Sequence, residues 1–212
     1  MGYQKMVGMP RQIRWGIEKE SEARQCYIMT MTQQCKVAVS IAPSGLTLTP
    51  EHCYLGATSD GIITHTQSPS AGVLEIKCPV SVSGESVSEL PPIEIAKYHP
   101  NFYLDSKDGA VQLKTTSNFY YQVQGEMPIK GCTWAHFVVW TAAKTDNIFI
   151  QEISLMSSYG LRKYYQLSFY LNALVPEILT RRLQKELFFY WHYCSGLNAC
   201  LIWFHTIIIV QM

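Results

Sequence analysis

The stretch LGATSDGIITHTQSPSAGVLEIKCP, residues 55–79, decides the fold that the sequence predicts. The apolar residues after Asp60 and the alternating residues around Glu75 each have the pattern of a β-strand, and the segment between them, which contains Ser, Pro and Gly, is typical of a turn. We therefore expect a β-hairpin that brings Asp60 beside Glu75. Because side chains alternate along a strand, Lys77 would share a face with Glu75, while the residues between would point to the other, packed face.

Two neighbouring carboxylates, Asp60 and Glu75, indicate a divalent-metal site. Their charges repel each other unless a hard cation lies between them, and Mg²⁺ accepts one or two carboxylates together with waters and phosphate oxygens. Lys77 would hold or activate an attacking water and offset the charge that develops on a phosphate. The same residues also fit an exposed strand with a cross-strand ion pair, which contributes little to stability. From these residues alone, both interpretations stay open.

The rest of the chain predicts further helices and strands around this hairpin. Helices are expected at residues 9–30, 93–98 and 116–127, strands at 35–41, 134–141 and 147–155, a loop at 81–92, and helical structure from residue 157 onward. Thr116 or Ser117 is available as the N-cap of the third helix, and Pro128 is expected to end it. Gln122 would lie on the inner face of this helix, where its amide needs partners that a catalytic site or an ordinary backbone contact could supply.

Four motifs occur along the chain in an order that is more specific than any one of them. They are Trp15–Arg24 (WGIEKESEAR), Ala57–Gly61 (ATSDG), Leu74–Pro79 (LEIKCP) and Tyr121–Gln124 (YQVQ). In this order they resemble the YqaJ viral-recombinase family of phage lambda exonuclease-like enzymes, a branch of the PD-(D/E)xK nucleases. The resemblance covers about residues 15–155.

The resemblance implies roles for individual residues. The metal ligands that it implies are Glu20, Asp60, Glu75 and the Ile76 carbonyl, around two Mg²⁺ or Mn²⁺ ions. The catalytic residues that it implies are Asp60, Glu75, Lys77 and Gln122, with Lys77 as the catalytic lysine and Gln122 positioning the water or the scissile phosphate. Without the resemblance, Glu20 and Arg24 at i, i+4 would be taken as a helix-surface ion pair worth a few tenths of a kcal/mol.

The resemblance also implies a fold and a function. The expected fold is α+β, in α/β/α layers, with a restriction-endonuclease-like core in which helices flank a central mixed β-sheet. A nuclease domain is expected over residues 1–195, followed by an apolar tail over 196–212. The expected function is a metal-dependent deoxyribonuclease that acts as a 5′-to-3′ exonuclease on linear duplex ends in recombination or repair. A single-strand annealing protein and further copies of the chain are the partners implied.

Two alternatives keep the same fold. One is an endonuclease, and the other is a catalytically inactive module that binds DNA or a protein. Three acids converging on one point argue against the inactive module, because a domain that does not cleave has no need of them. Cutting of a closed circular DNA would separate an endonuclease from an exonuclease.

Charge and cysteine content limit the classes of function. The formal net charge is +1, so overall charge gives no argument for nucleic-acid binding. A local cluster of cations near the start fits a basic path or a solvated helix face equally well; it consists of Arg11, Arg14, Lys19 and Arg24. The seven cysteines are scattered and never spaced as C-x₂-C, which indicates neither a disulfide framework nor a cysteine zinc site and fits a reducing compartment.

The two ends of the chain predict an intracellular protein. The N-terminus lacks the pattern of a signal peptide, so a location in the cytoplasm or nucleus is expected. Residues 197–210 are mostly apolar but too few to predict a membrane span, and no membrane association is expected.

Overall fold

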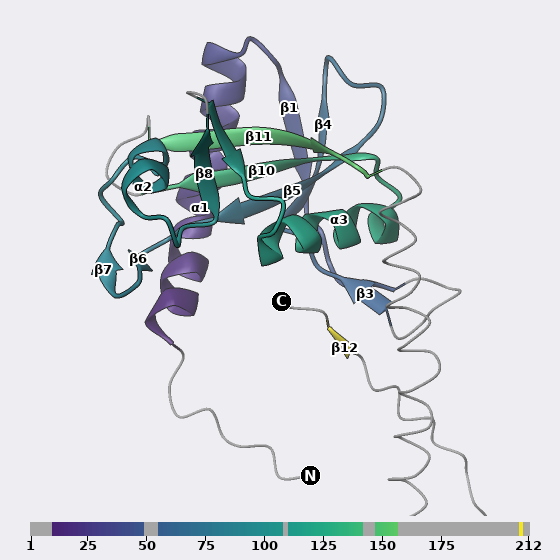
Figure 1. Ribbon diagram of the computed structural model, residues 1–212. Helices are drawn as coiled ribbons and strands as arrows, with labels where there is room; N and C mark the ends of the chain where they lie inside the picture. Colours follow the sequence, from purple (N-terminus) through teal and green to yellow (C-terminus); the bar gives the residue numbers. More distant parts are fainter. Residues whose placement is uncertain (1–9, 49–54, 108–109, 142–146, 157–207, 210–212) are drawn as a thin grey trace, which may run out of the picture. The chain divides into compact units, whose positions relative to one another are not determined.

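The computed structural model of the protein describes residues 10–48, 55–107, 110–141, 147–156 and 208–209. A five-stranded mixed sheet lies at the centre of this part of the chain. The strand order is β1-β4-β5-β10-β11 (Figure 1). The strands are β1 (Val39–Ala42), β4 (Gly61–His65), β5 (Gly72–Lys77), β10 (Trp134–Trp140) and β11 (Ile148–Ser154). Only the β5–β10 pair is parallel, and the other three pairs of this sheet are antiparallel.

The two central strands are buried along their whole length because both faces of the sheet are covered. All seven residues of β10 are buried, as are all residues of β5 except Lys77, which is half-buried. Such near-continuous apolar strands are typical of a sheet packed on two sides. The expectation that one face of β5 would be chemical and only the other packed is therefore too simple, because Val73 on the face of Glu75 is also fully buried.

Helix α1 (Arg11–Met29) covers one face of the sheet and continues as a π-helical turn, η1 (Thr30–Gln34). It runs behind the sheet in Figure 1. The side chains of Ala23 and Tyr27 are fully buried there and pack in one cluster with Leu74 of β5 and Val138 of β10. This helix lies within the range predicted at residues 9–30.

The opposite face carries α2 (Pro92–Tyr98), α3 (Asn118–Lys130) and the hairpin of β8 (Leu104–Lys107) and β9 (Ala110–Leu113). In Figure 1 these elements lie in front of the sheet or below it. Val123 and Met127 of α3 pack in a second cluster with Val73 and Phe137 of the sheet. The predicted central mixed sheet with helices on both sides is confirmed.

Short strands complete the described part of the chain. They are β2 (Thr47–Leu48), β3 (Leu55–Ala57) and β12 (Ile208–Ile209), which form a small sheet in the order β12-β3-β2, and the hairpin of β6 (Ser81–Val82) and β7 (Glu85–Ser86). The hairpin turns through Ser83 (φ 51°) and Gly84 (φ 88°), the pair of positive φ angles that a tight two-residue hairpin turn needs.

Several local expectations are wrong. Residues 81–92 are not simply a loop, because they contain the β6–β7 hairpin, and the first strand begins at Val39 rather than at residue 35. Pro128 does not end α3, which continues to Lys130. Pro128 removes only the one hydrogen bond that its own N–H would have donated, and Gly131 at φ 69° supplies the left-handed residue that stops the helix.

Two further expectations concern residues outside the described part of the chain. The helical pattern predicted from residue 157 lies outside the described residues, and so does the apolar tail at 196–212 apart from Ile208–Ile209. Within the described part of the chain, no helix combines the length and the apolar character needed to cross a membrane.

Candidate functional site

The β4–β5 hairpin brings Asp60 and Glu75 together, as predicted. Gly61 pairs with Leu74, so the residues before and after them, Asp60 and Glu75, lie next to each other at the end of the ladder. An Asp60 carboxylate oxygen, Oδ2, accepts a hydrogen bond from the backbone N–H of Ile76 at 2.6 Å. Asp60 is thereby fixed on the strand that carries Glu75.

Glu75 is the centre of a hydrogen-bond network that joins β5 to α3. It is only 3% exposed. Its Oε1 accepts hydrogen bonds from Lys77 Nζ at 2.6 Å and from the Gln122 side-chain amide at 2.8 Å. The same amide group of Gln122 donates to Glu126 Oε1 at 2.9 Å. The structure therefore brings together Asp60, Glu75, Lys77 and Gln122, all of which the sequence analysis singled out.

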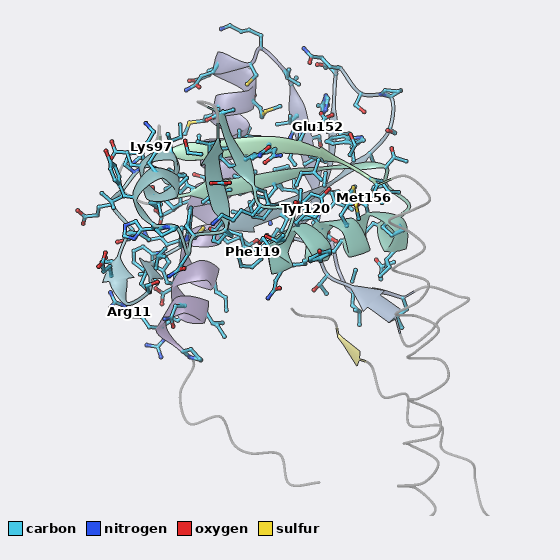
Figure 2. The ribbon with its side chains drawn as sticks, in the orientation of Figure 1. Arg11, Lys97, Phe119, Tyr120, Glu152 and Met156 are labelled. Carbon is cyan, nitrogen blue, oxygen red and sulfur yellow. The ribbon has the colours of Figure 1, made fainter. Side chains whose placement is uncertain are left out.

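Lys77 is held in its charged form. Burial lowers the pKa of Lys77, but the negative charges of Glu75 and Asp60 outweigh burial and leave that pKa raised. The ammonium also lies 4.6 Å from the ring centre of Phe119, a residue labelled at the start of α3 in Figure 2. A cation over an aromatic face is stabilised further where water is excluded. Lys77 is thus a fixed positive charge beside the carboxylates.

The carboxylates carry more negative charge than their surroundings offset. Burial, and next the charge of Glu75, raise the pKa of Asp60 to about 7. The same two causes raise the pKa of Glu126 to about 9. The remaining oxygens Glu75 Oε2 and Glu126 Oε2 are buried without a hydrogen-bond partner among the described residues. Unpaired carboxylate oxygens of this kind suit a hard divalent cation, which binds oxygen ligands.

Glu20 reaches the same place from α1. It pairs with Arg24 Nη2 at 2.7 Å, and this nitrogen also donates to the backbone carbonyl of Asp60 at 2.6 Å. A hollow of about 330 Å³ is lined by Glu20, Arg24, Ile41, Pro43, Ser44, Ser59 and Asp60. The helix-surface ion pair expected for Glu20 is therefore present, but Arg24 fastens it to the Asp60 backbone instead of leaving it on an isolated surface.

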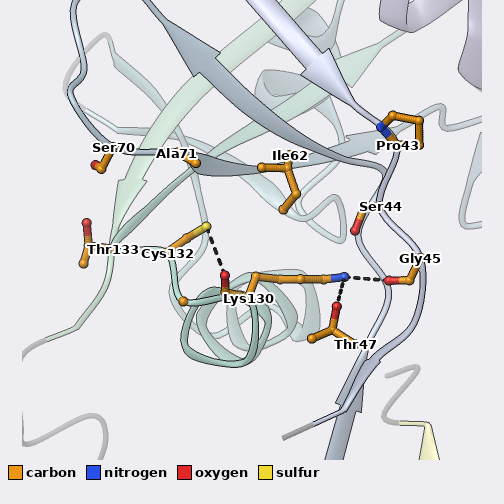
Figure 3. A pocket seen from close by; sticks show the side chains of 11 residues that line it. Pro43, Ser44, Gly45, Thr47, Ile62, Ser70, Ala71, Lys130, Cys132 and Thr133 are labelled. Atoms are coloured by element: carbon orange, nitrogen blue, oxygen red, sulfur yellow. Dashed lines mark hydrogen bonds between the residues drawn. The ribbon is translucent and has the colours of Figure 1, made fainter.

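A second hollow, of about 350 Å³, has a different character (Figure 3). Lys130 at the end of α3 crosses it and donates from Nζ to the Gly45 carbonyl at 2.6 Å and to Thr47 Oγ1 at 2.8 Å. Among the described residues that line it, none is acidic. The described residues of this hollow therefore offer no carboxylate to a divalent cation, and the lysine ties α3 to β2 and to the segment before it.

Three residues of the site were not assigned a catalytic or metal-binding role from the sequence: Arg24, Phe119 and Glu126. Each has a signal in helical spacing, because Arg24 follows Glu20 by four residues, Phe119 precedes Gln122 by three and Glu126 follows it by four. Spacing places these residues on the right helix face. Helical spacing does not show that the buried carboxylate of Glu75 packs against that face.

Comparisons with known proteins agree with this architecture. Two crystal structures of an alkaline exonuclease from Laribacter hongkongensis, one of them in complex with dAMP, share the fold at a TM-score of 0.57 and 22% sequence identity. The likeness covers 84% of this chain and 77% and 76% of the two exonuclease chains. No curated protein sequence matches this chain.

A family model covers more than half of the chain. The description of that family is "YqaJ-like viral recombinase domain", and the match spans residues 8–133. The matched segment contains α1, the β4–β5 hairpin and α3, and hence each residue that was predicted for the site. The chain belongs to the YqaJ-like viral recombinase family, on a restriction-endonuclease-like fold.

Proposed function

We propose that this chain is a metal-dependent deoxyribonuclease that hydrolyses DNA phosphodiester bonds from a 5′ end of a linear duplex. The observation that carries the proposal is the buried Glu75, which accepts hydrogen bonds from Lys77 and Gln122 through one oxygen, while its other oxygen has no hydrogen-bond partner among the described residues. The family and the fold of the alkaline exonuclease point to the same class of reaction. We propose that residues 1–195 form the nuclease domain.

The residues present fit two Mg²⁺ or Mn²⁺ ions. Asp60 and Glu75 would hold them, with Glu20 contributing from α1, where it lines the same hollow as Asp60. The Ile76 carbonyl is a further candidate, because the N–H and C=O of one strand residue face the same neighbour and this N–H meets Asp60. When bound, such cations draw charge from a phosphate oxygen and lower the pKa of a water.

Lys77 acts as a positive charge in this proposal, not as a base. In the metal-free protein, the negative charges of Glu75 and Asp60 outweigh burial and raise the pKa of Lys77, which favours the ammonium, and an ammonium cannot take a proton from water. Placed 2.6 Å from Glu75, it would face the negative charge that builds up on the phosphate during attack. A fixed charge at such a position lowers the barrier because it needs no rearrangement.

Gln122 has the contacts of a residue that positions a reacting group. Both of its donor contacts go to carboxylates, to Glu75 on β5 and to Glu126 one turn along α3. These bonds fix the plane of the amide, so its carbonyl oxygen, a hydrogen-bond acceptor, has one direction in which to meet a water. We propose that Gln122 positions the nucleophilic water or the scissile phosphate.

Release of label from a 5′-labelled linear duplex tests the function. In Mg²⁺, the wild-type chain is expected to release the label, chelator to prevent the release, and Lys77→Ala to abolish it. Lys114→Ala is the matched control, because Lys114 Nζ also donates a hydrogen bond at 2.6 Å, but to the Pro100 carbonyl on the exposed surface. Both alanine variants are to be compared by circular dichroism, so that a folding defect is recognised.

Two results would contradict the proposal. A folded wild type that releases no label in either Mg²⁺ or Mn²⁺ would argue for an inactive binding module of the same fold. Cutting of a covalently closed circle at the rate of the linear duplex would argue for an endonuclease. In either case the fold and the family membership would stand.

A further inference from the structure

A second group of ligand-type side chains lies on the other face of the sheet from Glu75. It consists of His65 on β4, His136 on β10 and Glu152 on β11. His136 pairs in parallel register with Leu74, one residue before Glu75, so it points to the α1 side, where it contacts Tyr27. Figure 2 labels Glu152 on the outer strand β11. The group is therefore separate from the proposed nuclease site.

The three side chains converge. One nitrogen of each histidine and one carboxylate oxygen of Glu152 all lie within 4.8 Å of one another. Glu152 stands directly opposite His136 on the neighbouring strand, with Oε2 at 3.7 Å from Nε2. The rings of His65 and His136 are nearly parallel, at 17°, with centroids 5.8 Å apart. One nitrogen of each ring and one carboxylate oxygen are thus close enough together for rotation of the side chains to bring them onto one ion.

His136 has the surroundings of a metal-binding histidine. Its Nδ1 lies 2.7 Å from the Tyr27 hydroxyl, which leaves Nε2 toward Glu152. The hydroxyl oxygen of Tyr27 can accept a hydrogen bond from Nδ1–H. Histidines that bind metals commonly donate their second nitrogen to a fixed partner in this way.

His65 supplies an independent observation. Its Nε2 is buried and has no hydrogen-bond partner among the described residues, although the Gln67 backbone N–H donates to its Nδ1 at 3.2 Å. An unpaired buried nitrogen costs free energy unless a ligand occupies it. A metal on Nε2 would require the ring proton on Nδ1, so the Gln67 N–H would have to turn to water, which is open to it because Gln67 is exposed.

We propose that His65, His136 and Glu152 form a site for Zn²⁺ or a closely similar first-row transition ion. Two imidazoles select such an ion over Mg²⁺, which prefers oxygen ligands. Metal–ligand distances of about 2.0–2.1 Å place tetrahedral ligands roughly 3.3 Å apart, so the present separations would close by about 1.5 Å at most. Glu152, whose side chain is 60% exposed, gives the ion a path from solvent.

The bound ion would join β4 to β11 across the sheet. Its three ligands come from β4, β10 and β11, which are not all neighbours, because β5 lies between β4 and β10. It would thus fasten the outer strand β11 to the hairpin that carries Asp60. The site also differs in kind from the cysteine zinc sites that the cysteine spacing argues against, because its ligands contain no sulfur.

Zn²⁺ titration of the full chain in excess Mg²⁺ tests the proposal without using nuclease activity. Excess Mg²⁺ occupies oxygen-only sites and leaves imidazole sites open. We expect one Zn²⁺ to bind by calorimetry and to raise the melting temperature. His65→Gln and Glu152→Gln should each weaken binding at least about tenfold, as loss of a ligand contact does.

His99→Gln is the matched control, because His99 also lies near a glutamate, Glu85, at 3.8 Å, but forms no such three-ligand group among the described residues. It should leave Zn²⁺ binding unchanged. Zn²⁺ binding of equal strength in wild type, His65→Gln and Glu152→Gln would place the ligands elsewhere and overturn the proposal. Absence of Zn²⁺ binding by the folded wild type would overturn it too, and would leave the proposed nuclease function untouched.

Discussion

Glu75 is the residue on which the proposed chemistry depends most. Replacing it by Gln removes one charge and one cation ligand while keeping the shape, and leaves Lys77 without its charged partner. We expect Glu75→Gln to lower kcat/KM by a factor on the order of 10²–10³ or more, because a positioned charge in a water-poor site has effects of that size. Label release in Mg²⁺ measures it.

Glu22→Gln is the control for that substitution, because Glu22 is a half-exposed acid on α1 that pairs only with Lys19 among the described residues. It should cleave like wild type. Full activity of the Glu75→Gln variant would contradict the proposed role of Glu75 in catalysis and metal binding.

The raised pKa values of Asp60 and Glu126 predict how stability depends on pH without metal. In the unfolded chain these acids ionise near pH 4, whereas in the folded chain their pKa values are about 7 and 9. Between those limits the folded state binds more protons, so the free energy of unfolding should fall as pH rises from 4 toward 9. The slope is at most about 1.4 kcal/mol per pH unit for each group.

Urea unfolding at several pH values in chelator measures this slope. A divalent cation binds the ionised acids, so Mg²⁺ should flatten the decline. Asp60→Asn should flatten it below pH 7, because the amide does not titrate. A stability that rises with pH over this range in chelator would contradict the pKa directions.

Among the elements, the β5–β10 pair depends on a glycine. A Cβ on Gly72 would lie 2.5 Å from the indole of Trp134, which covers that position. Gly72→Ala should therefore destabilise the protein by about 1–3 kcal/mol, the usual cost of overpacking a tight core. Thermal unfolding checks the prediction.

Gly16→Ala is the matched control, because nothing lies within 4 Å of a Cβ there. Gly16 is inside α1, where alanine is favoured over glycine by up to about 1 kcal/mol. The two substitutions should thus shift the melting temperature in opposite directions. A Gly72→Ala protein as stable as wild type would show that Trp134 can move aside.

The sequence predicts individual helices and strands better than the tertiary contacts between them. The β4–β5 hairpin follows from two runs of apolar residues and a turn, and it places Asp60 beside Glu75 because antiparallel register is set locally. Nothing local places Gln122 against Glu75, since their contact joins α3 to β5 across 47 positions. The β8–β9 hairpin was missed because its four-residue strands contain several polar residues and no strong alternation.

At the scale of the whole molecule, charge predicts that DNA binding needs metal. The net charge of +1 gives little general attraction to phosphate, and the candidate site itself is lined by carboxylates. We expect a labelled duplex to bind in Ca²⁺, which occupies oxygen sites, and to bind much more weakly in chelator. Fluorescence anisotropy at one fixed ionic strength measures both.

Glu75→Gln should reduce the gain in affinity that Ca²⁺ brings, whereas Glu22→Gln should not. Equal affinity for DNA in Ca²⁺ and in chelator would show that the duplex is held by a basic surface away from the carboxylates. The cations along α1 would then be the first residues to replace.

The parallel pairing of β5 with β10 also governs when the site can form. Val73 pairs with Ala135, about sixty positions later, and α3 lies in the connection between the two strands. Contacts so distant in sequence form slowly, because a long loop must close first. During synthesis the Asp60–Glu75 hairpin can fold early, but the strand beside it does not yet exist. The nascent chain would therefore gain its cutting centre only after β10 has left the ribosome.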